Sequence, residues 1–194
     1  MGHREQLMAG AKRCLEDRGY GRTTSRDLAA AADSPLGAIN YHYGSKEQLL
    51  NAALLETLRE WGDKMVPADP AEVGSDTGVA ERLDRMWSRV VRSQVTDRPL
   101  LVASLEALAQ AERSPEIRQQ IAEAYEQSRP KLAAELHGID SATDQPIARA
   151  VGSVHMALIA GLTQQWLIDP DNAPSAHEVA AGLRAIAQSL ESDA

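Results

Sequence analysis

The sequence of 194 residues contains a single cysteine, Cys14. One cysteine excludes an internal disulfide and any cysteine-rich metal site. Cys14 lies in a helical pattern, where a small buried hydrophobic residue is the favoured role. No uninterrupted apolar run approaches the ~18 residues of a membrane span, and no basic and apolar leader opens the chain. These absences predict a cytoplasmic protein that does not enter a membrane.

Motifs of the common enzyme classes are missing as well. The sequence has no GxSxG nucleophile elbow and no Walker-type phosphate loop, and no carboxylate pair stands out from the solvated charges. The histidines lack the paired spacing of a zinc site. We therefore predict a protein that is not an enzyme and that holds no metal or cofactor. The five histidines are His3, His42, His137, His155 and His177.

Acidic residues outnumber basic ones, but unevenly along the chain. The net charge is −8, which argues against a nucleic-acid partner because DNA binding depends on Lys and Arg neutralising phosphates. Residues 1–50 hold seven Lys/Arg and six Asp/Glu, so the acidity belongs to the remaining 144 residues, with 13 against 22. A dimer therefore still presents basic side chains from its N-terminal part: Arg4, Lys12, Arg22, Arg26 and Lys46.

The stretch Leu28–Lys46 predicts two short helices joined by a tight turn. An alanine-rich helix runs to Ala32, and Asp33 tolerates the left-handed backbone of a turn. Ser34 then predicts the N-cap of the second helix and Pro35 its first residue. This pattern favours a helix-turn-helix, with an ordinary helical hairpin that packs an aromatic-rich surface as the alternative.

The second helix has a face suited to a DNA groove. Ile39 is best placed to point inward, and Gly37 with Ala38 keeps the opposite surface low. We expect the major-groove contacts to come from Leu36, Gly37, Asn40, Tyr41 and His42. Phosphate contacts are expected from Thr24, Ser25, Tyr43 and Lys46. For Thr24 a second role is equally open, because Thr24 and Asp27 form the pattern of a capping box.

The run TTSRDLAAAADSPLGAINYHYGSKEQLL resembles the DNA-binding domain of the TetR family of transcriptional regulators. The paired threonines, the turn, the Gly-Ala-Ile, the aromatic-His-aromatic run and the Ser-Lys-Glu fall in the family's order. Three residues depart from it: Asp33 replaces a usual glycine, Ser34 a small hydrophobe and Asn40 a tyrosine. The resemblance implies a mode of DNA binding more than an operator sequence, because Asn40 replaces a common phosphate or base contact with an amide suited to adenine.

The remaining pattern is helical, with no alternating strand and no hairpin signal. We predict an all-α fold of about nine helices, with a helix-turn-helix domain over residues 1–50 and a helical effector-binding and dimerisation domain over 51–194. Pro67–Thr77 predicts an exposed loop, and Pro130 predicts a kink. The expected later helices are Ser45–Val66, Gly78–Val95, Pro99–Glu112, a helix from Ser114 to His137, Pro146–Leu167 and Ser175–Glu191.

The resemblance implies that the C-terminal helices enclose a small-molecule effector. Candidate lining residues combine polar or polarisable groups with apolar helical faces, although such residues are more often core. These candidates are Met86, Trp87, Gln94, Ser104, Leu105, Tyr125 and His155. Two apolar stripes, on Pro146–Leu167 and Ser175–Glu191, predict a four-helix interface in a homodimer.

Together these features favour a dimeric repressor that a neutral or cationic, largely hydrophobic ligand releases from a double-stranded operator. The alternatives are a helical DNA-binding protein without an effector, or an enzyme of undetected type.

Overall fold

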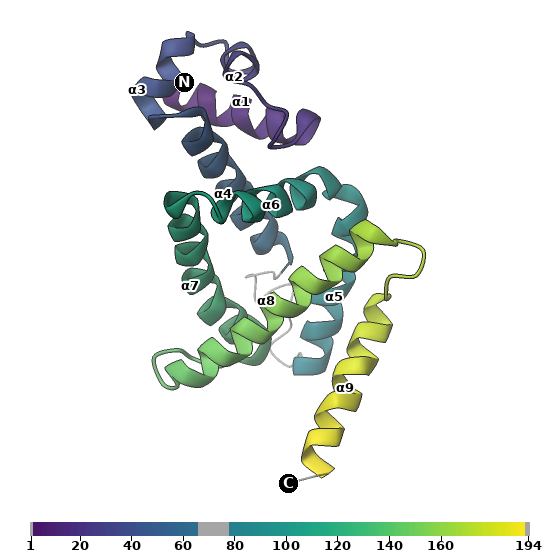
Figure 1. The fold of residues 1–194 in the computed structure, drawn as a ribbon. Helices are drawn as coiled ribbons and strands as arrows, with labels where there is room; N and C mark the ends of the chain where they lie inside the picture. The colour runs from purple at the N-terminus through teal and green to yellow at the C-terminus, as the bar shows by residue number, and fades with distance from the viewer. Residues whose placement is uncertain (1, 66–77, 193–194) are drawn as a thin grey trace. The chain divides into compact units, whose positions relative to one another are not determined.

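A computed structural model describes residues 2–65 and 78–192 of the chain. The described residues form nine α-helices and no strand, which confirms the all-α prediction (Figure 1). The helices are α1 His3–Arg18, α2 Ser25–Ala31, α3 Leu36–Tyr43, α4 Lys46–Met65, α5 Val79–Thr96, α6 Arg98–Ala111, α7 Pro115–His137, α8 Gln145–Ile168 and α9 Ala176–Ser192.

The predicted helix boundaries agree with these to within one or two residues. One predicted N-cap is wrong. Ser34 is not the N-cap of α3: Pro35 occupies that position without a side-chain cap, and the Ser34 hydroxyl instead donates to the Ala32 carbonyl at 3.1 Å. Asp33 does adopt the left-handed conformation expected of it, with φ 47°. The predicted loop Pro67–Thr77 and the residue before it, Val66, lie outside the described residues. Helix α7 continues through Pro130.

The described chain divides into two compact units. The first contains residues 1–62 and 97–125, and the second contains residues 63–96 and 126–194. This grouping by packing differs from a division at residue 50, because α6 and the first part of α7 pack with the N-terminal helices. The functional division into residues 1–50 and 51–194 stays a prediction.

The first unit has one continuous apolar core. Helix α1 packs against α2, α3 and α6, and α2 packs against α3. Leu7, Leu28, Ile39 and Leu50 are fully buried at its centre, so each short helix of the turn is anchored by a leucine or isoleucine. Cys14 is buried in the same core, as its helical pattern indicated.

The second unit is built on α5, which packs against α8 and α9. Its core includes Trp87, which is fully buried, together with Met86 and Val90 on the same face of α5. Helix α7 lies close to α8 at Gly152, where an added Cβ would collide with the backbone of Arg129. Glycine at this position therefore sets the distance between the two helices.

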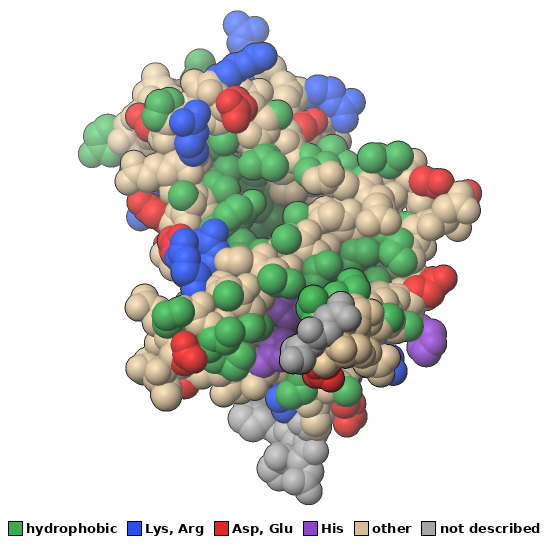
Figure 2. All heavy atoms as spheres, turned by 60° about the horizontal axis from the view of Figure 1, so that its bottom comes forward, with side chains coloured by type: hydrophobic (Ala, Val, Ile, Leu, Met, Phe, Trp, Pro, Cys, Tyr) green, Lys and Arg blue, Asp and Glu red, His purple; other side chains and the backbone are tan. Residues whose placement is uncertain are grey.

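Hydrophobic side chains remain exposed on α8 and α9 (Figure 2). By length and composition alone α8 would be able to cross a membrane, and 28% of its most apolar window is buried in this chain. Core helices of soluble proteins meet the same criteria. The exposed large hydrophobic residues of the two helices are Ile147, Val154, Ile168, Ile186 and Leu190.

Candidate DNA-binding and effector sites

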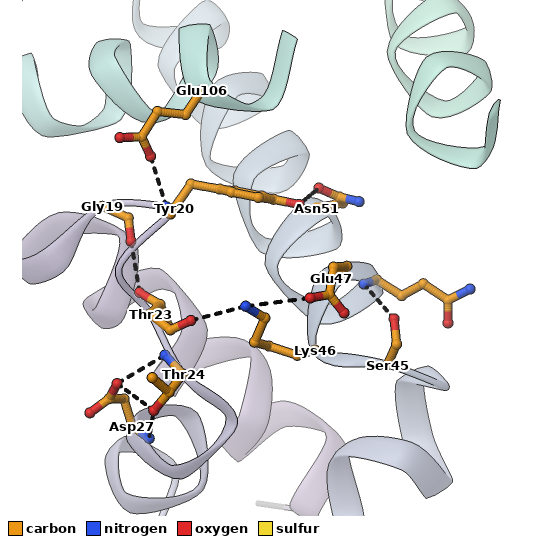
Figure 3. Close-up of polar contacts among 12 residues, drawn as sticks. Gly19, Tyr20, Thr23, Thr24, Asp27, Ser45, Lys46, Glu47, Asn51 and Glu106 are labelled. Atoms are coloured by element: carbon orange, nitrogen blue, oxygen red, sulfur yellow. Dashed lines mark hydrogen bonds and ion pairs between the residues drawn. The ribbon is translucent and has the colours of Figure 1, made fainter. Parts of the chain in front are cut away.

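The start of α2 is held by a capping box. The Thr24 backbone N–H and hydroxyl donate to one carboxylate oxygen of Asp27 at 2.9 and 2.6 Å, and the Asp27 N–H donates back to the Thr24 hydroxyl at 3.2 Å (Figure 3). These hydrogen bonds hold the pKa of Asp27 below its usual value. The capping role of Thr24 is thus confirmed. The first backbone N–H groups of the helix, at Ser25 and Arg26, have no intrahelical acceptor and remain suited to a phosphate.

Three hydrogen bonds to other parts of the first unit hold the loop between α1 and α2 in place (Figure 3). The buried Tyr20 hydroxyl donates to the Asn51 side-chain oxygen on α4 at 2.6 Å. The Gly21 N–H donates to Glu106 on α6 at 2.9 Å, and the Lys46 ammonium donates to the Thr23 carbonyl at 3.2 Å. The position of the loop, and of the N-terminus of α2 that follows it, is therefore set by both α4 and α6.

Helix α3 is anchored in the first unit by one fully buried residue, and half of its residues are exposed to solvent. Ile39 is buried as predicted, whereas Gly37 and Asn40 are exposed. Tyr41 is 86% exposed and Leu36 is 51% exposed. His42 is half-buried, with its ring edge-on to Tyr41 at a centroid distance of 4.8 Å. An amide, a phenol and an aliphatic side chain thus project from one short, firmly held helix.

Two of the predicted phosphate contacts already have partners in the protein. The Tyr43 hydroxyl donates to the Arg4 carbonyl at 3.0 Å, and its ring lies under the Arg4 guanidinium. Since that proton is committed, Tyr43 has none left to donate to a phosphate in this conformation. Lys46 shares its ammonium between the Thr23 carbonyl and the Glu47 carboxylate, 3.4 Å away. The phosphate roles of both residues stay predictions.

The N-terminal cations are not equally available. Lys12 is paired with Glu56 and Glu60 on α4, each at 2.8 Å, so it serves the packing of α1 on α4. Arg22 donates to the Arg18 carbonyl at 2.9 Å, which leaves its guanidinium at the surface.

A second cluster of functional interest lies within the second unit. The rings of Trp87 and His155 are 6.3 Å apart between centroids, and the His155 Nε2 lies 2.8 Å from the Nε2 of His137. Burial lowers the pKa of His155 to about 4, and burial together with the Arg82 charge lowers the pKa of His137. Burial therefore favours the neutral form of both rings. The sequence singled out His155 and Trp87 but gave no signal for His137, which the fold brings to them from the end of α7.

Gln94, another predicted effector contact, is buried farther along α5. Its amide donates to the Thr163 hydroxyl on α8 at 3.3 Å, so it joins the same pair of helices. Met86 is buried beside Trp87.

The other three predicted effector contacts belong to the first unit. Ser104 and Leu105 are half-buried on α6, where the Ser104 hydroxyl donates to the Leu101 carbonyl at 2.7 Å, and Tyr125 is exposed on α7. A cavity of about 10 Å³ lies in this unit, lined by residues of α4, α6 and α7 that include Asn51 and Gln120. It is far smaller than the ~300–1,000 Å³ of typical ligand pockets. No cluster of three or more metal-ligating side chains occurs within residues 2–65 and 78–192.

These features define a class of protein: a helical chain with an N-terminal helix-turn-helix head. Two protein families match this chain, and together the matches cover most of its length. Residues 7–53 match the family described as bacterial regulatory proteins, tetR family, and residues 79–191 match the BetI-type transcriptional repressor C-terminal family. The second match covers more than half of the chain. The protein belongs to the TetR family.

Curated relatives match over part of the chain. The HTH-type transcriptional repressor AcnR of Corynebacterium glutamicum is 37% identical over 78 residues, which are 40% of this chain and 37% of AcnR. The HTH-type transcriptional regulator TtgR of Pseudomonas putida is 38% identical over 69 residues, which are 36% of this chain and 32% of TtgR. The matched region thus spans about a third of the length of these relatives.

Solved structures match over nearly the whole chain. The multidrug binding protein EbrR in complex with imidazole is 27% identical, with a TM-score of 0.67 and coverage of 94% of this chain and 95% of EbrR. EbrR in complex with proflavin superimposes with a TM-score of 0.69 at 23% identity, covering 95% of this chain and 99% of EbrR. The shared fold therefore extends through the C-terminal helices.

Proposed function

We propose that this protein is a transcriptional repressor that binds an operator through α3 and is released from it by a small molecule. The observation that carries the proposal is the exposed face of α3, which presents Asn40, Tyr41 and Leu36 from a head whose core is closed. The match to a BetI-type repressor family and the similarity to the repressor AcnR support repression over activation.

In this proposal Asn40 reads a base and the N-terminus of α2 holds a phosphate. An asparagine amide pairs with adenine through two hydrogen bonds, and an aliphatic side chain such as Leu36 suits a thymine methyl group. Gly37, Tyr41 and His42 complete the surface that enters the major groove. Ser25 and Lys46 are the better candidates for phosphates. The hydroxyl protons of Thr24 and Tyr43 are already donated within the head, whereas the Lys46 ammonium has a third N–H beyond its contacts with Thr23 and Glu47.

We assign the exposed hydrophobic face of α8 and α9 to a homodimer. Apolar side chains at Val154 and Ile186 are 58% and 60% exposed, and a two-fold interface would bury both. Among the described residues, no other part of the chain comes within 4 Å of the place where a Cβ on Gly161 of α8 would lie, so this position leaves room for a helix of the second copy. A partner copy explains the apolar surface of α8 in a cytoplasmic DNA-binding protein that has no catalytic role.

The repressor is released from its operator if the effector favours a spacing of the dimer's two helix-turn-helix heads that differs from the spacing of the two operator half-sites. Helix α4 runs without a break from Lys46 to Met65, so a shift at its far end becomes a tilt at its near end. A ligand acts only through its preference between the two arrangements. A typical coupling of ~1–3 kcal/mol would lower operator affinity ~5–150-fold.

The test is a gel-shift titration with the DNA that flanks the protein's own gene, over a range of salt concentrations. Asn40→Ala should reduce the preference for the operator over unrelated DNA by ~1–3 kcal/mol. Lys46→Ala is the matched control: it should weaken binding to all sequences alike and flatten the salt dependence. If Asn40→Ala keeps the operator preference of the parent, Asn40 reads no base.

The same titration separates the competing functions. Absence of any sequence preference in the parent protein would refute the regulator. Operator binding that no hydrophobic small molecule reduces would favour the alternative, a DNA-binding protein without an effector.

A further inference from the structure

The carboxylate of Glu106 on α6 fastens the loop between α1 and α2. One of its oxygens accepts a hydrogen bond from the Gly21 N–H at 2.9 Å (Figure 3). The carboxylate also lies against Gly19, since a Cβ added there would be 3.6 and 3.8 Å from its two oxygens. A charged acceptor makes a stronger hydrogen bond than a neutral one. Glu106 therefore holds this loop at its centre.

The packing of α6 explains why Glu106 reaches the loop. Helix α6 packs on α1, and its residues Ala103 and Ala107 are buried in the core of the first unit. Small side chains at such a contact allow two helices to come close together. Glu106 is three positions after Ala103, so the two residues are neighbours on the helix surface. The close approach of α6 thus brings the carboxylate to the backbone of the loop.

The hydrogen bond to Gly21 is not needed to satisfy a buried group. Gly21 is exposed, so water would serve its N–H in the absence of the carboxylate. What Glu106 adds is a fixed position for a glycine peptide, and glycine loses more conformational freedom on folding than any other residue. The contact therefore contributes to the position of the loop more than to the stability of the core.

The fastened loop continues to Lys46. The Thr23 hydroxyl donates to the Gly19 carbonyl at 2.7 Å, which closes the loop on itself. The Lys46 ammonium, at the start of α4, donates to the Thr23 carbonyl at 3.2 Å (Figure 3). A continuous series of contacts thus leads from the carboxylate on α6 to a cation that is a candidate phosphate contact.

We propose that Glu106 is a positioning residue for operator binding, and that it acts by fixing the loop on which the Lys46 ammonium rests. This inference rests on the proposed DNA-binding function. It extends the DNA-binding head to α6, a helix that the division at residue 50 assigns to the effector-binding domain. The charge of a carboxylate by itself opposes the binding of DNA phosphates. Positioning and repulsion therefore have opposite effects on affinity, and substitutions separate them.

Gel-shift titrations of the full-length protein make this separation. Glu106→Ala should weaken binding to operator and unrelated DNA alike, about 3- to 10-fold, because the loop loses its hydrogen bond. It should also flatten the salt dependence, in the same direction as Lys46→Ala. Glu106→Gln keeps an acceptor for the Gly21 N–H and should bind at least as tightly as the parent. Glu112→Ala is the matched control, because it removes an exposed carboxylate at the end of the same helix and should not weaken binding.

A double-mutant cycle tests whether Glu106 acts through Lys46. In a Lys46→Ala background the contact that Glu106 positions is gone, so Glu106→Ala should cost less than about 2-fold. In an Asn40→Ala background it should keep its full effect of about 3- to 10-fold. A residue that only stabilises the fold would cost the same in both backgrounds.

A measurement without DNA tests the hydrogen bond itself. In amide exchange followed by NMR, the Gly21 amide of the parent should exchange about 3- to 10-fold more slowly than an unprotected amide. Glu106→Ala should remove this protection and Glu106→Gln should restore it. An unprotected Gly21 amide in the parent would overturn the proposal without reference to any variant.

Two results of the DNA titrations would also overturn the proposal. Equal losses in the Lys46→Ala and Asn40→Ala backgrounds would make Glu106 a structural residue only. Unchanged or tighter binding by Glu106→Ala would leave no more than repulsion. Both results keep operator binding by the parent protein intact. A parent protein that prefers no operator would instead refute the proposed function, and the role of Glu106 with it.

Discussion

The hydrogen bond between Tyr20 and Asn51 joins the loop before α2 to α4, and its removal should destabilise the DNA-binding head. Both residues are buried, at 5% and 4% exposure, and the phenol donates at 2.6 Å. Tyr20→Phe leaves the amide oxygen of Asn51 buried without its donor. Such a loss costs ~1–3 kcal/mol. For a chain of this length that corresponds to a fall in Tm of ~2–4 °C for each kcal/mol.

Urea unfolding followed by helical circular dichroism, at one fixed protein concentration, measures the change in the free energy of unfolding. Tyr41→Phe is the matched control, because it removes the same hydroxyl from a side chain that is 86% exposed, and it should stay within ~0.5 kcal/mol of the parent. Adding Asn51→Leu to Tyr20→Phe should recover part of the loss, since both polar partners are then gone. Equal stability of the two phenylalanine variants would refute the reasoning.

The same residue predicts an alkaline limit to stability. Burial, together with the Glu47 charge, raises the pKa of Tyr20 to about 12, above the value of ~10 for a tyrosine in an unfolded chain. Folding therefore favours the protonated phenol. Its contribution is fully present below pH ~10 and is lost as the pH rises toward 12. Tyr20→Phe should remove this part of the alkaline dependence.

Two further substitutions test the helix packing and the dimer. Gly152→Ala should destabilise the protein by ~1–3 kcal/mol in urea unfolding, because the new Cβ meets the Arg129 backbone. The control Gly62→Ala has open space around the new Cβ and should stabilise the protein by up to ~1 kcal/mol. Equal stability of the two variants would contradict the close approach of α7 to α8. Ile186→Glu on α9 places two charges in the proposed two-fold interface and should give monomers in sedimentation, while Val95→Glu, at a position 74% exposed on α5, should not. A dimer that survives Ile186→Glu would place the interface elsewhere.

The sequence by itself determined the helices, because their ends depend on residues a few positions apart. The pair Thr24 and Asp27 caps α2 as its spacing predicts. The sequence also identified Ile39 as the buried residue of α3. The error at Ser34 has a local reason: its hydroxyl bonds the carbonyl of the preceding turn in preference to the N–H groups of the next helix.

The tertiary structure alone decided which distant side chains meet. The Glu106 carboxylate accepts a hydrogen bond from the Gly21 N–H, 85 positions away in the sequence. No hydrophobic periodicity in the sequence predicts this contact. His137 meets His155 because α7 ends where α8 passes, at a separation set by Gly152. Such contacts depend on the distance and angle at which helices cross. Those quantities follow from the packing of whole faces, and a single chain position carries little information about them.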